Sequence, residues 1–500
     1  MQKSLRINVV SNLIRTLVLT ILSFITFPWV CRYLGASALG TYTWANTFVL
    51  YFLILAKIGI PNLAIRECIK VKDNKELLSN KVQTFFLLQL VTTILSFALM
   101  TALVFAVPDL RNSYELIFIL SINFLVGAFS FEWVFIALEK QFYMSVRSIV
   151  VLCITAMLVV IFVANPDDLY IYSLITVGVT VLTTIANLFY IGKFISFKKT
   201  MPYSLKGYGK TLMTLFGISL LVSLYNQTDT FVLGFIDKSK NEVGAYSIGV
   251  KAIDIIIGFF TALSTVFIPR AALLYKEEDK TNYHETNKYS VNLLMFIVLP
   301  AIATMMILSK PICALISGNY NYDESMGYTT SPYILMTLCF MMLTYSLGDM
   351  IYGQILLPQK KEKHYLFALG GGTLINIGLS LIFGLTIYKD HPSLGVSIGT
   401  MITDVLVLAY LLFVSWEYIK KPILNFNNLK ILITTLLIVG LTFALLNPIY
   451  QLGLLFNGGA SVAMAIQIVF IVLIDAIVYL LILFLLKENI IRSIFKRKSK

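Results

Sequence analysis

Long runs of hydrophobic residues follow one another along almost the whole chain. A typical run, residues 466–486, reads IQIVFIVLIDAIVYLLILFLL and shows no alternation of apolar and polar positions. A hydrocarbon core about 30 Å thick requires about 20 apolar residues per helix, whereas the strands of a membrane barrel alternate over about ten residues. The pattern therefore predicts an all-α integral membrane protein and argues against an outer-membrane barrel.

Charged and turn-forming residues divide these runs into about fourteen predicted transmembrane helices. In chain order they cover 8–30, 40–64, 82–107, 115–138, 146–164, 169–192, 211–236, 244–268, 290–309, 330–352, 365–388, 394–416, 430–447 and 461–486. The first helix follows the basic start MQKSLR, but its apolar run is too long for a signal peptide and has no A-x-A cleavage site. We expect it to be retained.

Lys and Arg are distributed unevenly over the predicted loops. One set of alternate loops together with both tails holds 30 of the 39 cations, and the opposite loops hold six. Because cytoplasmic loops of membrane proteins are enriched in Lys and Arg, this count predicts that both termini are cytoplasmic. The same asymmetry accounts for the net charge of +13, so no nucleic-acid partner is predicted.

Composition and loop length argue against an enzyme. Of the residues, 58% are hydrophobic and 13% are charged, against about 25% charged in soluble proteins. No predicted loop exceeds about 22 residues, so there is no room for a soluble catalytic domain. The five scattered cysteines form no CxxC pair, the three histidines fall in loops or at helix ends, and Asp167 and Asp168 belong to a predicted turn. No metal site and no cofactor are expected.

A weak internal repeat divides the chain. The motifs LG and GTY occur within 34–42, and LG and GAY recur within 233–246, six predicted helices later. An even number of helices gives both copies the same orientation, as in transporters built from parallel repeats. We therefore expect an N-terminal lobe (1–210), a C-terminal lobe (211–428), and two further helices with a basic tail (429–500).

Charged residues inside the predicted helices are the candidate functional residues, because each costs about 2.5–3.5 kcal/mol in hydrocarbon. Arg15 and Lys57 lie in the first two helices, and Asp229, Lys251 and Asp254 lie in the two that correspond to them under the repeat. Two structural alternatives stay open. Arg15 and Lys57 are close enough to the cytoplasmic boundary to snorkel, and Lys251 and Asp254, three residues apart, can neutralise each other.

Other embedded polar residues have several interpretations. The four consecutive polar residues Asn226, Gln227, Thr228 and Asp229 cover every face of one helix, so some of them must line a cavity or bond a neighbouring helix. Asp404 and Asp475 lie deep, where interhelical hydrogen bonding and ion coupling are both open. Glu132 and Asp349 lie near helix ends and are expected to be packing or interfacial groups.

Three segments of the chain resemble a known family. The first contains RYLG and GTY within 32–42, followed by Gly59-Ile60 and Arg66-Glu67. The second is residues 229–246, with Leu233-Gly234 and Gly244-Ala245-Tyr246. The third is Gly353-Gln354 followed by LPQKKEK at 357–363. Together with the helix plan they resemble the bacterial polysaccharide and O-antigen flippases of the multidrug/oligosaccharidyl-lipid/polysaccharide exporter superfamily. The resemblance implies two six-helix lobes around a central cavity and alternating access in the bacterial plasma membrane. It also implies that a polyprenyl-diphosphate-linked oligosaccharide is moved to the outer leaflet for synthesis of O-antigen, capsule or exopolysaccharide.

The resemblance also assigns roles to residues. Arg15, Lys57 and Lys251 would offer cations to the diphosphate, with Asn226, Gln227 and Asp229 beside them in the cavity. Lipid II flippases depend on cations in the corresponding first, second and eighth helices, but here two of the three are Lys, which cannot hold phosphate in the bidentate manner of Arg.

The sequence also leads to expectations about the energy source, the partners and the alternative functions of the protein. The resemblance is compatible with coupling to a proton or sodium gradient, through Asp254, Asp404 or Asp475, or to the membrane potential. Expected partners are the lipid-linked oligosaccharide, membrane lipids, and a polysaccharide polymerase with its assembly proteins. The alternatives are a drug/cation antiporter of the same superfamily and, less favoured, a polysaccharide polymerase or ligase, which normally needs a large basic outer loop.

Overall fold

The computed structural model describes residues 2–198, 202–456 and 459–496, and all regular structure in these ranges is helical. The expectation of an all-α membrane protein is confirmed. By its internal contacts the chain divides into two compact units, which we call unit 1 (Met1–Phe235) and unit 2 (Ile236–Lys500). Each unit is described by itself below.

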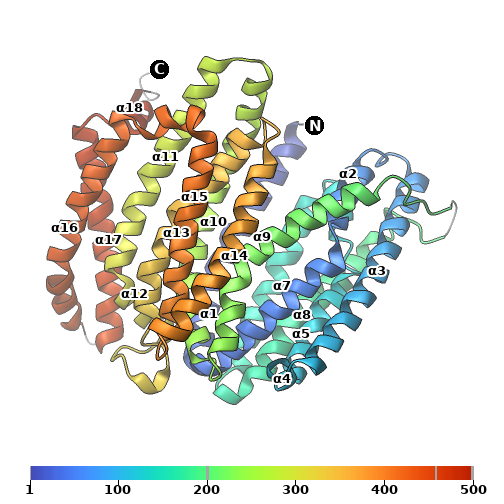
Figure 1. Cartoon of the computed structure of the whole chain (residues 1–500), viewed down its shortest axis with the longest axis horizontal. Coiled ribbons are helices and arrows are strands. Elements are labelled where there is room, and N and C mark those ends of the chain that lie inside the picture. The colour runs from blue at the N-terminus through green and yellow to red at the C-terminus, as the bar shows by residue number, and fades with distance from the viewer. Residues whose placement is uncertain (1, 199–201, 457–458, 497–500) are drawn as a thin grey trace. The chain divides into compact units, whose positions relative to one another are not determined.

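The helices of unit 1 run from the N-terminus, blue in Figure 1, to the first green helix. They are α1 (Gln2–Lys57), α2 (Ile60–Ile69), α3 (Lys75–Ala106), α4 (Pro108–Arg111), α5 (Tyr114–Gly127), α6 (Glu132–Ala137), α7 (Gln141–Phe162), η1 (Pro166–Asp168), α8 (Leu169–Ile191) and α9 (Gly209–Ile236). The predicted turn at Asp168 is confirmed, because its Oδ2 accepts hydrogen bonds from the backbone N–H groups of Ala164 and Asn165, both at 2.9 Å.

Unit 2 contains the remaining helices, including two short π-helical segments. They are α10 (Asn241–Lys276), α11 (Lys280–Ile307), α12 (Ser309–Ser317), η2 (Glu324–Met326), α13 (Ser331–Ile351), η3 (Tyr352–Leu356), α14 (Glu362–Ile382), η4 (Phe383–Ile387), α15 (Pro392–Ile423), α16 (Phe426–Leu454), α17 (Gly459–Leu485) and α18 (Asn489–Lys496). The last long helices, α16 and α17, pack against each other, and Tyr479 of α17 donates a hydrogen bond to the Phe296 carbonyl of α11 at 2.7 Å.

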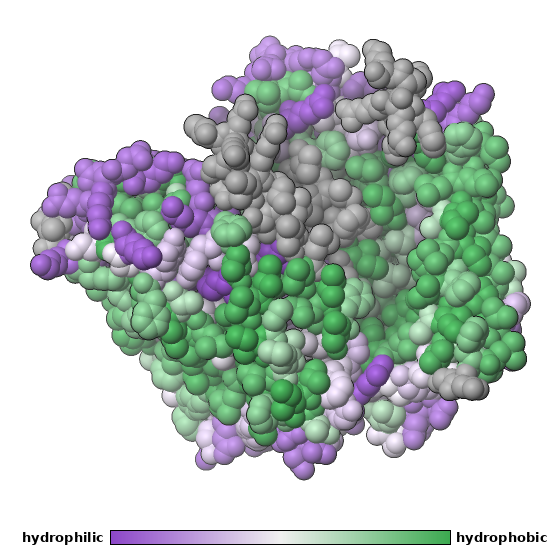
Figure 2. Space-filling model, turned by 180° about the vertical axis from the view of Figure 1, so that it is seen from behind, coloured by the Kyte–Doolittle hydropathy of each residue, from purple (hydrophilic) through white to green (hydrophobic). Residues whose placement is uncertain are grey.

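Eleven helical segments in the described ranges are long and apolar enough to cross a membrane, so the chain is a multi-pass membrane protein. On the face shown in Figure 2, hydrophobic side chains form a band over the helices of each unit, with hydrophilic side chains gathered at the helix ends. One of the eleven, Val18–Ile69, is 52 residues long and holds two predicted helices, whereas α9 and α10 are not among them. The number fourteen therefore stays a prediction.

The beginning of the chain corrects two predicted boundaries. The gap expected between 30 and 40 is a single non-helical residue inside α1, Gly35, with φ 73° and ψ 173°. Essentially only glycine adopts this backbone conformation, so one residue replaces the expected loop. The second predicted helix does not reach residue 64. Ile58 and Gly59 both have positive φ, and the chain restarts there as the short helix α2.

Helix α9 is held in unit 1 by close packing against α1. Trp44 of α1 is completely buried, and its indole Nε1 donates a hydrogen bond to the Phe231 carbonyl of α9 at 3.2 Å. Gly234 lies against the same indole ring, where an added Cβ would be 1.9 Å from Cδ1. The two units are defined by their internal contacts, whereas the predicted lobes are defined by the sequence repeat. The units therefore do not test the lobes 1–210 and 211–428, which remain a prediction.

We predict that Gly234→Ala lowers the stability of the protein, because the new methyl group cannot be placed without displacing the buried Trp44 ring. Overpacking of this kind costs about 1–3 kcal/mol. The measurement is the thermal unfolding midpoint in detergent together with membrane abundance. Gly217→Ala in the same helix is the matched control, since its Cβ meets nothing within 4 Å. Equal stability of the two variants would contradict the packing described here.

Candidate functional site

Polar groups inside the long helices fall into two classes. Some are buried and bonded to neighbouring helices, and others are accessible and have no partner among the described residues. Because an unpaired charge in hydrocarbon is costly, the second class marks positions that reach water, a headgroup or a ligand. The distinction separates structural charges from candidate binding residues.

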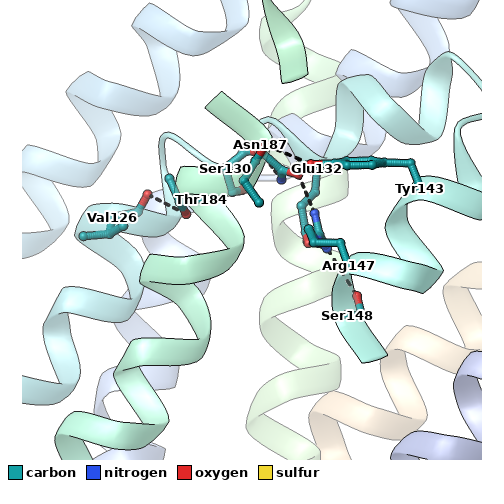
Figure 3. Close-up of polar contacts among 9 residues, drawn as sticks. Val126, Ser130, Glu132, Tyr143, Arg147, Ser148, Thr184 and Asn187 are labelled. Atoms are coloured by element: carbon teal, nitrogen blue, oxygen red, sulfur yellow. Dashed lines mark hydrogen bonds and ion pairs between the residues drawn. The ribbon is translucent and has the colours of Figure 1, made fainter. Parts of the chain in front are cut away.

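A buried network in unit 1 belongs to the first class and is drawn in Figure 3. The Arg147 side chain of α7 is only 6% exposed and donates from Nη2 to Glu132 Oε1 at 2.7 Å and from Nη1 to Asn187 Oδ1 at 2.6 Å. Asn187 of α8 in turn donates to the Ser130 carbonyl at 2.6 Å, in the break between α5 and α6. Tyr143 donates to Asn187 Oδ1 at 3.2 Å. The network ties together α6, α7, α8 and this break.

This network corrects one prediction and confirms another. Arg147, at the boundary of the predicted helix 146–164, was counted among the loop cations, but α7 begins at Gln141 and carries Arg147 inside it. The chain therefore has an embedded cation in addition to Arg15, Lys57 and Lys251. The signal that could have found it is the flanking sequence MSVRSIVVL, which is apolar around a single charge. The packing role expected for Glu132 is confirmed by its ion pair with Arg147.

The two deep acids of unit 2 are also bonded. Asp404 of α15, 3% exposed, accepts a weak hydrogen bond from Thr344 of α13 at 3.5 Å. Asp475 of α17, 4% exposed, accepts from Thr442 of α16 at 2.7 Å and from Thr304 of α11 at 3.4 Å. Interhelical hydrogen bonding is therefore present at both acids, and ion coupling at these positions stays a prediction.

The residues of the polar cluster of α9 differ in exposure. Gln227 accepts a weak hydrogen bond from Thr47 of α1 at 3.5 Å, so the expected bond to a neighbouring helix is confirmed. Thr228 and Asp229 are buried, at 4% and 6% exposure. Asn226 is exposed. Of the three α9 residues expected in a binding cavity, Asn226 is thus the most accessible.

The accessible charges are four of the predicted site residues and one that was expected to be structural. Lys57 and Asp254 are exposed, and Arg15, Lys251 and Asp349 are partly exposed. None of the five makes a hydrogen bond or ion pair through its side chain within the described part of the chain, and no ion pair within 4.0 Å joins Lys251 to Asp254. Their charges are available to solvent or to a ligand.

We predict that Arg147→Ala lowers membrane abundance and the unfolding temperature, because it removes donors from buried Asn187 and leaves Glu132 unpaired. Glu132 is 46% exposed, so water compensates part of the loss, and we expect about 1–3 kcal/mol instead of the larger cost of breaking a fully buried pair. Lys140→Ala, at the start of the same helix, should have little effect. If both variants accumulate and unfold like the unaltered protein, the network is not structural.

Two family models and a protein of known description match this chain. The family model for polysaccharide biosynthesis proteins matches residues 5–275, and the MatE family model matches residues 215–382. A protein of Escherichia coli (strain K12), described as an O-antigen transporter, is 24% identical over 405 residues, which cover 78% of this chain and 92% of that protein.

Solved structures of similar fold come from two transporter groups. The lipid II flippase MurJ in an inward closed conformation gives a TM-score of 0.68 at 19% identity, covering 99% of both chains. An inward-facing multidrug resistance MATE family transporter of the MOP superfamily gives 0.56 at 16% identity, covering 80% of this chain and 96% of that one. At these identities the likeness shows a shared fold.

The expected resemblance is therefore confirmed, and with it the expectation of a transporter instead of an enzyme. The first family model covers more than half of the 500 residues. The protein belongs to the polysaccharide biosynthesis protein family.

Proposed function

We propose that this protein is a flippase that carries polyprenyl-diphosphate-linked oligosaccharides from the cytoplasmic to the outer leaflet of a bacterial plasma membrane. The product would supply the synthesis of O-antigen, capsule or exopolysaccharide. Support comes from the family of the chain and from relatives described as an O-antigen transporter and a lipid II flippase. The host's polysaccharide polymerase and assembly proteins are the partners that this role requires.

The observation that carries the proposal is the presence, in long apolar helices, of accessible cations that have no partner among the described residues. Arg15 and Lys57 lie in α1, and Lys251 lies in α10. A diphosphate cannot cross hydrocarbon without charge compensation, and cations whose charge is not already neutralised can provide it. Arg147 cannot serve in this way, because its side chain is buried and its charge is already paired with Glu132. Lys57 and Lys251 would act as point charges instead of bidentate clamps.

The helix breaks of unit 1 are suited to the movement that flipping requires. Gly35 interrupts α1, Ile58 and Gly59 separate α1 from α2, and a positive φ at Phe131 separates α5 from α6. Such breaks absorb changes in φ and ψ during alternating access. We infer that the lobes 1–210 and 211–428 move about a shared substrate site, with 429–500 outside it.

A proton or sodium gradient acting on Asp254, Asp404 or Asp475, or the membrane potential, would supply the energy.

A drug/cation antiporter is the second candidate. The accessible acids Asp254 and Asp349, the match to the MatE family model and the fold shared with a MATE transporter favour it. An antiporter would use embedded acids to hold a cationic substrate, whereas a flippase would depend on the embedded cations. Charge-removing variants therefore separate the two functions.

We predict that Arg15→Ala and Lys57→Ala each lower surface polysaccharide about tenfold or more while membrane abundance is unchanged, because they remove charge that is not used for folding. The measurement is polymer export normalised to the amount of protein in the membrane. Lys389→Ala, in an exposed loop, is the control and should export normally. Full export in both α1 variants would indicate that these cations only snorkel.

The pair Lys251 and Asp254 provides a further check on the same prediction. If the two residues only neutralised each other, the double variant Lys251→Ala/Asp254→Asn would restore both abundance and export. If Lys251 contacts the diphosphate, the double variant should accumulate normally and remain inactive, because removing the acid does not replace the cation. Lys251→Arg, which keeps the charge, should retain partial export.

We predict a topology in which both termini are cytoplasmic, because 30 Lys and Arg lie on one side of the predicted spans and six on the other. Reporters fused after residues 75, 205, 280 and 500 should then report the cytoplasm. Reporters after 111, 240 and 320 should report the outside. A single interior fusion on the opposite side would require a different set of spans.

A further inference from the structure

Asp349 differs from two other acids in the helices of unit 2, Asp404 and Asp475. Asp404 and Asp475 are buried and accept hydrogen bonds from threonines of neighbouring helices. Asp349, in the last turn of α13, is only partly buried, and no described residue donates a hydrogen bond to it. A carboxylate offers about four acceptor positions. No described residue takes up any of those on Asp349.

Two tyrosines flank this carboxylate. Tyr352 is the first residue of η3 and Tyr365 lies in the first turn of α14, and their rings stack with centroids 4.2 Å apart and planes 23° apart. Both rings are partly exposed. Asp349 is three residues before Tyr352, which places the two on one helical face, and its carboxylate is within electrostatic range of both phenol groups. We call these three neighbouring, partly exposed residues the tyrosine–acid surface.

The backbone around this surface is fixed by packing. Gln354 in η3 is fully buried, its Nε2 donates to Ser290 Oγ at 2.9 Å, and its carbonyl accepts from Tyr283 at 2.8 Å. Gly353 lies so close to Ile268 that an added Cβ would be 2.6 Å from Cδ1. Short π-helical segments are frequent at functional sites, and a fixed one holds Tyr352 in place before any ligand arrives.

The chemistry of this surface fits a sugar. The apolar face of a tyrosine ring can cover the C–H face of a pyranose, and a carboxylate with free lone pairs accepts hydrogen bonds from sugar hydroxyl groups. The same carboxylate repels a diphosphate. An organic cation would also be attracted to an acid beside aromatic rings. Each of the two stacked rings has one outer face left for a ligand of either kind, so an organic cation is included as a competing ligand in the binding test.

We propose that Asp349, Tyr352 and Tyr365 contact the oligosaccharide part of the transported lipid and contribute to its selection. The proposal rests on the proposed flippase function and deepens it, since it separates recognition of the sugar from neutralisation of the diphosphate. A site that bonds a substrate hydroxyl group discriminates against a ligand that lacks it. A hydrogen bond to a charged acceptor changes affinity by about tenfold or more.

The test compares two lipids bound by the full-length protein in lipid nanodiscs. The first is polyprenyl-diphosphate-linked oligosaccharide extracted from the host, and the second is bare polyprenyl diphosphate. The unaltered protein should bind the first about tenfold or more tightly than the second. Asp349→Asn, which keeps the shape of the side chain, and Tyr365→Ala should bring this ratio near one while the affinity for the bare lipid is unchanged.

Matched variants and further outcomes complete the experiment. Tyr289→Ala, at an exposed tyrosine of α11 in the same unit, should keep the ratio, and Tyr365→Phe should keep most of it. Unfolding temperatures show that the variants are folded. A ratio that is unchanged in both Asp349→Asn and Tyr365→Ala would overturn the inference, as would variants that lose only the binding of ethidium, an organic cation. Failure of the unaltered protein to bind either lipid would instead overturn the proposed function, and the inference with it.

Discussion

The absence of water from the hydrocarbon region is the constraint on which the rest of this structure depends. A polar side chain at that depth must be paired within the protein or must reach water, a headgroup or a ligand. Arg147 meets the first condition through Glu132 and Asn187, and Asp475 meets it through Thr442 and Thr304. Lys57 and Lys251 have no such partner in the part of the chain that the structure describes, so the same rule that makes Arg147 structural makes these lysines candidates for binding.

Small residues and rigid aromatic rings position these groups. Trp44 and Gly234 bring α1 and α9 into close contact, which places Gln227 of α9 beside Thr47 of α1. At the other end of unit 1, the aromatic residues of α6 pack on α2 and α3 in one buried cluster, and Tyr143 stacks on Tyr190 with centroids 4.3 Å apart. Packing of this kind holds the elements between the helix breaks together.

The accessible charges differ between the units. In unit 1 those with no partner among the described residues include the cations Arg15 and Lys57, whereas in unit 2 Lys251 is accompanied by the acids Asp254 and Asp349. An amphiphilic substrate with an anionic diphosphate and a neutral or charged glycan presents both kinds of group. Cations suit the first part and acceptors the second, which gives the mixed charges of unit 2 a chemical reason within the proposed function.

The sequence by itself determined the helical membrane architecture, the turn at Asp168 and the presence of charges within the helices, because apolar run length and local turn chemistry are written in neighbouring residues. Only the tertiary structure decided which charges are neutralised. Arg147 was counted among the loop cations, yet it is buried in a network. Asp349 was expected to be a packing or interfacial group, and the structure leaves it partly exposed with no partner among the described residues. Hydropathy gives the depth of a residue but not the direction it faces. The groups that settle its role lie far along the chain, as Asn187 lies 40 residues from Arg147 and Thr304 lies 171 residues from Asp475.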